Sequence, residues 1–146
     1  MPTDIDFLVA DEDALKLKKI FPFALTKDCG EGLFLYIGRN GEIEFMSQDN
    51  INIKGSDYTF RLTDLCWKNT TLLKGNDFEL RLCNVADTIL LKSILQRGKE
   101  KEKHDLEDIK ALMKVCEIDK KYLEQRFLEI KGDQRVRDIL KKFNVI

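Results

Sequence analysis

The hydrophobic pattern of the chain changes character near residue 84. Before that point, short apolar runs typical of strands alternate with Gly, Asn and Asp, and one stretch over about residues 12–21 has helical spacing. Beyond it, apolar residues recur three and four positions apart, as on the buried face of a helix. The pattern predicts an α+β fold, with a β-rich core over residues 1–83 and a helical subdomain over residues 84–146 packed on it as one compact unit.

The expected strands are short and are separated by turn residues. The first ends at Val9, and the later ones are expected at Leu33–Ile37, Glu42–Met46, Tyr58–Leu62, Thr70–Leu73 and Phe78–Leu82. The sequence Gly38-Arg39-Asn40-Gly41 predicts a tight hairpin between two of them, because Asn and Gly tolerate the positive φ that such turns need.

Capping residues set the expected ends of the helices. Asp11 is the expected N-cap of the first helix, and Pro22 ends it. The later helices are expected over about 85–98 with Asn84 as cap, from near Lys103, from a cap at Asp119 to an end at Gly132, and after Asp133.

Composition narrows the function classes. Lys and Arg (25) nearly balance Asp and Glu (26), and the two signs are interleaved along the sequence, which argues against nucleic acid as a partner. No apolar run approaches the ~20 residues that a membrane-spanning helix needs, and the N-terminus has no signal-peptide pattern. A cytoplasmic location is therefore expected, with no membrane partner.

The cysteines and the histidine do not form a metal motif. The single histidine is His104, and no two cysteines are paired as C-x-x-C; the cysteines are Cys29, Cys66, Cys83 and Cys116. Each cysteine that lies among apolar residues is expected to fill a small space in the core. Neither a structural zinc nor a disulfide is expected in a reducing compartment.

Carboxylates at the start of the chain are the first candidate chemistry. Side chains alternate across a strand, so Asp4 and Asp6 are expected on one face and Ile5 and Phe7 on the other. Two acidic groups repel each other unless water screens them or a divalent cation lies between them. The pair therefore has two interpretations, a solvated strand face or part of a magnesium site.

A third carboxylate is available on a later strand. Glu42 and Glu44 share one face of the strand expected at Glu42–Met46, and Glu44 is preferred because it lies deeper in the strand. A D-x-D strand, then a helix, then β-rich sequence with another strand carboxylate resembles the nucleotidyltransferase superfamily. That resemblance implies a mixed β-sheet of nucleotidyltransferase type, with Asp4, Asp6 and Glu44 as catalytic residues and ligands of Mg²⁺.

The helical part adds a second resemblance. Asn84–Lys92, then Arg97, then Lys103–Ile109 resemble the C-terminal signature of small AbiEii-like nucleotidyltransferases, which have a helix lysine, an arginine and a K/R-D-x-x-D-[IL] motif. Lys92, Asp105 and Asp108 match this pattern, and the resemblance implies that they bind the nucleotide or the acceptor. The implied reaction is Mg²⁺-dependent transfer of a nucleoside monophosphate from an NTP to an unknown acceptor.

The chain departs from the family pattern at two places. The family has a Gly-Ser turn before the D-x-D strand that holds the triphosphate, and only Met1, Pro2 and Thr3 precede Asp4. A start assigned downstream of the true one, or a shortened and degenerate member, would each explain this. In addition, His104 stands where the family has Lys or Arg, and its charge depends on pH.

Two non-enzymatic interpretations remain open. A binding or regulatory protein, as a toxin–antitoxin component or oligomer partner, would keep the fold without the chemistry and would have an exposed sheet edge covered by another subunit. A structural interaction domain would place Asp4 and Asp6 in bulk water, far from Glu44. For Asp105, the structural alternative is the first turn of a helix, since negative charge there suits the helix dipole. The structural alternatives are a solvated position on the same helix face for Asp108 and a surface position on a helix for Lys92.

Overall fold

The computed structural model describes residues 5–23, 25–29, 32–37, 43–53, 55–101 and 103–146. In these residues the fold is mixed α/β, with six α-helices and eight strands in three small sheets. Contacts between residues divide the chain into two units. The first consists of Met1–Asn52 and Asp57–Leu62, and the second of Ile53–Ser56 and Thr63–Ile146.

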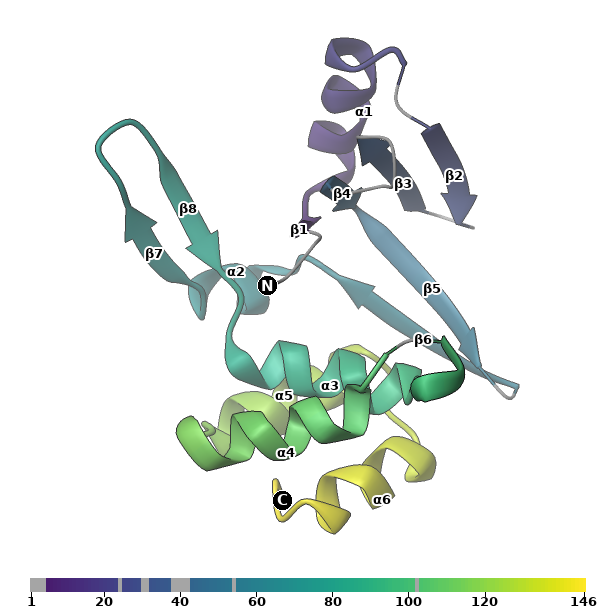
Figure 1. Cartoon of the computed structure of the whole chain (residues 1–146), viewed down its shortest axis with the longest axis vertical. Helices are drawn as coiled ribbons and strands as arrows, with labels where there is room; N and C mark the ends of the chain where they lie inside the picture. The colour runs from purple at the N-terminus through teal and green to yellow at the C-terminus, as the bar shows by residue number, and fades with distance from the viewer. Residues whose placement is uncertain (1–4, 24, 30–31, 38–42, 54, 102) are drawn as a thin grey trace. The chain divides into compact units, whose positions relative to one another are not determined.

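The first unit contains a four-stranded sheet in the order β1-β4-β3-β2 (Figure 1). Its strands are β1 (Ile5–Leu8), β2 (Leu25–Cys29), β3 (Gly32–Ile37) and β4 (Ile43–Met46). β1 runs parallel to β4, whereas β3 pairs antiparallel with both β2 and β4. A parallel pair needs a crossover connection, and the helix α1 (Asp11–Ile20), which contacts β3, lies in it.

The start of α1 differs from the expectation by one residue. Asp11 is not the N-cap: Ala10 occupies that position and its side chain makes no capping bond, while Asp11 is already helical. Asp11, Glu12 and Asp13 together place negative charge in the first turn, where it interacts favourably with the helix dipole. The dipole interaction therefore replaces the side-chain cap at this end of the helix.

A second sheet consists of β5 (Gln48–Ile53) and β6 (Ser56–Arg61). Gly55 in the turn between them has a φ of +83°, a region that side chains rarely adopt. The apolar residues Tyr58 and Phe60 of β6 are 0% and 4% exposed. The strand expected at Tyr58–Leu62 is thus present, but it begins two residues earlier.

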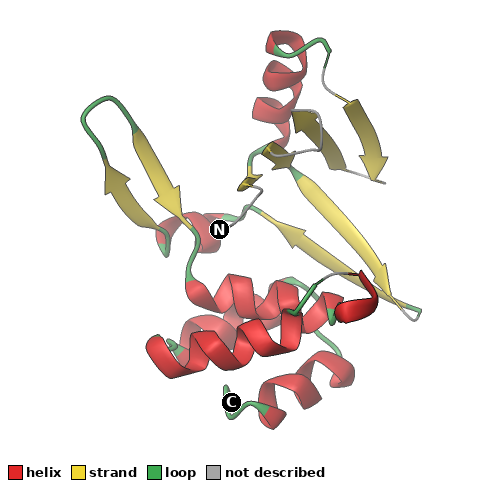
Figure 2. Cartoon of the chain, viewed as in Figure 1, coloured by secondary structure: helices red, strands yellow, loops and turns green. Residues whose placement is uncertain are grey.

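The helix α3 (Val85–Leu95) is the centre of the second unit (Figure 2). It contacts α4 (Asp105–Val115), α5 (Lys120–Glu129) and α6 (Gln134–Lys142). Helix α3 contributes four fully buried apolar side chains to this core, Ala86, Ile89, Leu90 and Ile94. Burial of apolar area against three partners is the main favourable term for this unit.

Three of the expected N-caps are confirmed. The side-chain oxygens of Asn84, Asp119 and Asp133 accept hydrogen bonds from the backbone amides of Ala86, Tyr122 and Val136, at 2.9, 3.0 and 3.1 Å. Each bond satisfies one amide that has no partner inside its helix. Local sequence therefore fixes where α3, α5 and α6 begin.

The boundary between the units falls after Leu62, earlier than the boundary at residues 83 and 84 suggested by the change of pattern. The second unit also contains α2 (Asp64–Lys68), β7 (Thr71–Lys74), β8 (Glu79–Leu82) and a 3₁₀ turn η1 (Lys99–Lys101). Polar contacts explain the difference, because Thr63 bonds Glu129 of α5 and Cys66 of α2 contacts Asp87 of α3. Long-range contacts of this kind leave no periodic signal.

Two strands and one α-helix were not expected from the sequence, namely β2, β5 and α2. The sequences Leu25-Thr-Lys-Asp-Cys29 and Gln48-Asp-Asn-Ile-Asn-Ile53 are mostly polar, so alternation hardly marks them. Helix α2 has only five residues, too few for helical periodicity. The hairpin expected at residues 38–41 lies outside the described residues, although Ile37 and Ile43 on either side are register partners.

Gly132 does not end α5 by adopting the left-handed conformation. Lys131 does so, with a φ of 58°, and the amide of Gly132 donates a hydrogen bond to the carbonyl of Phe127 at 2.8 Å. Gly132 is needed for another reason: a Cβ atom there would lie 2.4 Å from Cε2 of the Phe127 ring. The turn therefore combines backbone strain at Lys131 with a close approach at Gly132.

Lys131→Gly is expected to raise the free energy of unfolding by roughly 0.5–1 kcal/mol, because glycine adopts a left-handed backbone without a steric cost. Gly132→Ala is expected to lower it, since the methyl group collides with Phe127. Urea unfolding followed by the fluorescence of Trp67, the only tryptophan, would measure both changes in the second unit. Equal effects of the two substitutions would contradict this account of the turn.

Candidate functional site

Asp6 and Glu44 are register partners on the parallel strands β1 and β4. Neighbouring strands lie about 4.8 Å apart, and partners in register project from the same face of a sheet. Phe7 and Phe45, the next pair, project from the other face and stack with their ring centroids 5.0 Å apart. The parallel register thus places two carboxylates side by side, backed by an aromatic pair.

The two carboxylates offer the oxygen ligands that Mg²⁺ and Mn²⁺ prefer. Asp6 is exposed and Glu44 is partly buried, so the pair can be reached from solvent. Asp4, the third predicted ligand, lies outside the described residues, as does the alternative Glu42. In the part of the chain that the structure describes, no group of three His, Cys, Asp or Glu residues suits a metal ion.

Lys92, Asp105 and Asp108, which the sequence singled out, meet where α3 ends and α4 begins. We call these three residues and Arg97 the α3–α4 cluster. Nζ of Lys92 lies 2.6 Å from Oδ2 of Asp108 and 3.6 Å from Oδ1 of Asp105. One lysine therefore bridges two carboxylates that are one helical turn apart.

Asp105 is held mainly by Arg97. The backbone amide of Arg97 donates to Oδ2 of Asp105 at 2.7 Å, and its guanidinium donates through Nε at 3.0 Å and through Nη2 at 3.2 Å. In return, the backbone amide of Asp105 donates to the carbonyl of Arg97 at 3.2 Å. These contacts fix the turn between α3 and α4.

Arg97 and Lys92 stabilise the ionised form of the Asp105 carboxyl group. Burial raises the pKa of this carboxyl, but the hydrogen bonds and the charge of Arg97, with the charge of Lys92, outweigh burial and lower the pKa below its ordinary value. Its side chain is 1% exposed, whereas those of Lys92 and Asp108 are 23% and 47% exposed. Solvent thus reaches the cluster at Lys92, at Asp108 and at Arg97, whose side chain is 33% exposed.

His104, the departure from the family motif, directly precedes α4. It occupies the N-cap position without a side-chain capping bond, and it is exposed. Asp105, Glu107 and Asp108 place negative charge in the first turn of this helix, as the structural alternative for Asp105 proposed. Both the dipole and the ion pairs therefore act on Asp105.

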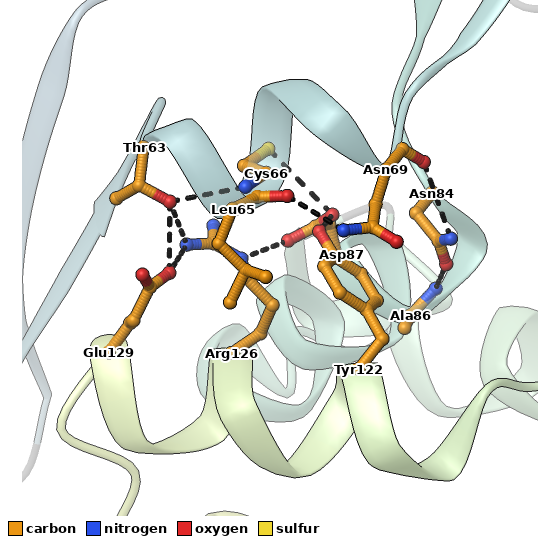
Figure 3. A network of polar contacts seen from close by, with 10 residues as sticks. All are labelled: Thr63, Leu65, Cys66, Asn69, Asn84, Ala86, Asp87, Tyr122, Arg126 and Glu129. Atoms are coloured by element: carbon orange, nitrogen blue, oxygen red, sulfur yellow. Dashed lines mark hydrogen bonds and ion pairs between the residues drawn. The ribbon is translucent and has the colours of Figure 1, made fainter.

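Sequence reasoning missed a second polar cluster, the buried network of Asp87, Tyr122 and Arg126 between α3 and α5 (Figure 3). Nε of Arg126 donates to Oδ1 of Asp87 at 2.6 Å, and the hydroxyl of Tyr122 donates to Oδ2 of Asp87 at 2.5 Å. The side chains of Asp87 and Arg126 are each 1% exposed. An arginine and a carboxylate are thus paired inside the core.

The buried network extends to α2 and to the end of α5. Nη1 of Arg126 donates to Oγ1 of Thr63 at 3.2 Å and also pairs with Glu129. Sγ of Cys66 lies 3.8 Å from Oδ2 of Asp87. Burial, and secondarily the charge of Asp87, raises the pKa of the Cys66 thiol to about 12, so this cysteine stays protonated and unreactive.

The contacts of the buried network are made within the chain. Among the described residues, no fully buried side-chain nitrogen or oxygen lacks a hydrogen-bond partner. The network therefore reads as structural rather than as a ligand site. A sequence signal does exist, because Asp87 lies beside the apolar Ala86 and near Ile89, and Arg126 lies between Leu123 and Phe127. Charged residues inside an apolar stripe of this kind indicate a buried pair, but the sequence does not say which residues pair.

No family model, curated protein or solved structure matches this chain. Among the helices of the described residues, none combines the length and the apolar character that crossing a membrane requires. The proposal of a function therefore rests on the α3–α4 cluster and on the acidic pair of Asp6 and Glu44.

Asp87→Asn is expected to lower the free energy of unfolding of the second unit by about 3–5 kcal/mol, because it removes the buried counter-charge of the Arg126 guanidinium and leaves only the partly exposed Glu129 paired with it. Glu124→Ala, which removes the partly exposed pair of Glu124 on α5 with Arg137, is the matched control and should cost at most about 1 kcal/mol. Urea unfolding would compare them. Similar losses would show that burial does not decide the strength of these pairs.

Asp105 is expected to contribute less to the free energy of unfolding at acid pH than at neutral pH. A carboxyl whose pKa is lower in the folded state stabilises the fold above its unfolded pKa, and the stability is lost as the pH falls through the folded pKa. The difference in unfolding free energy between the wild type and Asp105→Asn should therefore be largest near neutral pH and shrink below about pH 4. Urea unfolding at several pH values measures it, and a difference independent of pH would contradict the argument.

Proposed function

We propose that this chain is a nucleotidyltransferase-like protein that binds a divalent cation and an NTP at Asp6 and Glu44. The observation that carries the proposal is the parallel register of β1 and β4, in which these carboxylates are direct partners. The same register speaks against the interpretation in which Asp6 lies far from Glu44. Asp4, two residues before Asp6, is proposed as the third ligand.

The proposed roles follow from the chemistry of the side chains. Asp6 and Glu44 hold the cation through hard oxygen ligands and keep its remaining positions available to phosphate oxygens. A cation at this point would neutralise charge that develops on the pyrophosphate leaving group. A carboxylate next to the acceptor hydroxyl can also take its proton as a general base. The proposed reaction transfers a nucleoside monophosphate to an acceptor whose nature is open.

A separate part of the proposal concerns the α3–α4 cluster. Lys92 is partly exposed, and its ammonium can donate to a phosphate oxygen while Asp108 and Asp105 hold it in place. Asp105 is a positioning residue in this scheme, since its carboxylate is already bound by Arg97.

We also propose that the protein is cytoplasmic and has no membrane partner. Its balanced charge disfavours nucleic acid as a partner.

One observation favours a second candidate, a non-catalytic binding or regulatory protein that keeps the fold. Asp105 is almost fully buried, and its carboxylate is bound by Arg97 and Lys92. A cluster whose contacts are complete within the chain can serve stability alone. This candidate predicts a folded protein that does not bind NTP in the presence of metal.

Calorimetric titration with Mn²⁺, alone and together with each NTP, distinguishes the two candidates. The proposal expects saturable metal-dependent binding that weakens at least about tenfold in Asp6→Asn and in Glu44→Gln, because each variant loses a charged ligand. Asp11→Asn, in the exposed first turn of α1, is the control and should bind as the wild type does. Adding Asp4→Asn to Asp6→Asn should abolish binding.

Two results would contradict this proposal. Binding that is unchanged in Asp6→Asn and Glu44→Gln would mean that the metal ion binds at other residues. No binding by a wild-type protein that is folded by circular dichroism would favour the non-catalytic candidate.

A further inference from the structure

The strands β7 and β8 form a ribbon that is exposed along its whole length. They pair antiparallel (Figure 1), with Leu73 opposite Leu80. All eight of their residues are exposed. Within the described residues, neither outer edge of the ribbon pairs with a further strand. A two-stranded ribbon is at best marginally stable in water, so a partner for this one would stabilise it.

One face of the ribbon is apolar. Side chains alternate along β8, so Phe78, Leu80 and Leu82 share a face and are 53%, 39% and 50% exposed. Leu73, opposite Leu80 on β7, lies on the same face and is 44% exposed. An apolar edge strand of this kind is a template for pairing with another strand.

The backbone of β8 has a defined outward-facing edge. The amide of Gly75 donates to the carbonyl of Phe78 at 2.9 Å, which marks these two residues as a hydrogen-bonded pair. Such pairs alternate along an antiparallel ladder, so the polar backbone groups of Leu80 face β7. Those of Glu79 and Arg81 face away from β7, toward the open edge.

This geometry restricts how β8 can pair with a second β8. Outward-facing residues must meet outward-facing residues, so an antiparallel pair can be centred on Glu79, on Leu80 or on Arg81. Centres on Glu79 or Arg81 place two like charges directly opposite each other, which is unfavourable. The centre on Leu80 places Glu79 of each copy opposite Arg81 of the other.

We propose that two copies of this chain associate through β8, antiparallel about a two-fold axis at Leu80, to form a four-stranded sheet. In this register, Phe78 of each copy lies opposite Leu82 of the other on the apolar face. On the other face, two Glu79–Arg81 pairs form. The backbone groups of these same residues supply the hydrogen bonds of the new ladder.

Charge complementarity selects a second copy over other partners. The exposed charges of the ribbon alternate in sign, with Nζ of Lys74 lying 2.7 Å from Oε1 of Glu79 and the guanidinium of Arg81 lying 4.5 Å from the ring centroid of Trp67. A nucleic acid would instead require grouped positive charge. A two-fold interface is self-complementary, which is what the Glu-x-Arg spacing of β8 provides.

A pair of charge variants tests the register. Glu79→Arg gives a β8 with two positive charges, and Arg81→Glu gives one with two negative charges. Each variant alone should associate at least about tenfold more weakly than the wild type, because like charges then face each other. An equimolar mixture should restore the dimer, since every facing pair in the mixed dimer has opposite signs.

Sedimentation velocity over a concentration series measures all four samples, with Lys68→Glu on α2 as a charge control that should dimerise normally. A wild type that stays monomeric at several hundred micromolar would overturn the proposal. Variants that dimerise as well as the wild type, or a mixture that stays monomeric, would also overturn it.

A cross-link provides a second readout that does not depend on charge. In the proposed register Leu80 faces Leu80 of the second copy, within the Cα separation that a disulfide spans. Leu80→Cys should therefore form a covalent dimer on mild oxidation, and peptide mass spectrometry should find the link between the two introduced thiols. Leu72→Cys, on β7 and the opposite face, is the control, and equal cross-linking of both variants would contradict this register.

Discussion

The second unit depends on one buried ion pair. Asp87 of α3 and Arg126 of α5 are each 1% exposed. Asp87 also contacts Cys66 of α2, and Arg126 donates to Thr63, the N-cap of α2. A helix of five residues such as α2 has little stability of its own, so these contacts hold it in place. The ribbon β7–β8 lies between α2 and α3 in the chain, and the same ion pair therefore fixes both of its ends.

The two polar clusters of the second unit differ in solvent accessibility, and this difference distinguishes a cluster that serves stability from one that can also bind a ligand. The buried network is closed, with a cysteine whose pKa is raised to about 12 and a tyrosine whose pKa is raised by burial and by Asp87. In the α3–α4 cluster Asp105 is buried, whereas Lys92, Arg97 and Asp108 are partly exposed. Only the exposed side chains can give up contacts within the protein to bind a ligand. Within this one cluster, the buried residue therefore serves stability and the exposed residues are available for binding.

Local sequence was sufficient to predict where a helix begins when a single capping residue determines that position. Asn84, Asp119 and Asp133 were expected to cap helices and do so, because a cap bond joins residues two or three positions apart. The expectation was wrong at Asp11, which lies inside α1. Gly132 belongs to the turn that ends α5, but Lys131 is the residue of that turn that adopts the left-handed conformation. In both cases several neighbouring groups can fill the same role, and the choice depends on packing.

For the candidate sites, the sequence by itself determined which residues carry charge and how they are spaced, including Asp6, Glu44, Lys92 and Asp105. The parallel register that makes Asp6 the partner of Glu44, and the turn that brings Arg97 onto Asp105, were decided by the tertiary structure. So was the pairing of Asp87 with Arg126. These contacts join residues that are distant in the chain, and their energy depends on burial and hydrogen-bond geometry, which exist only once the elements have packed.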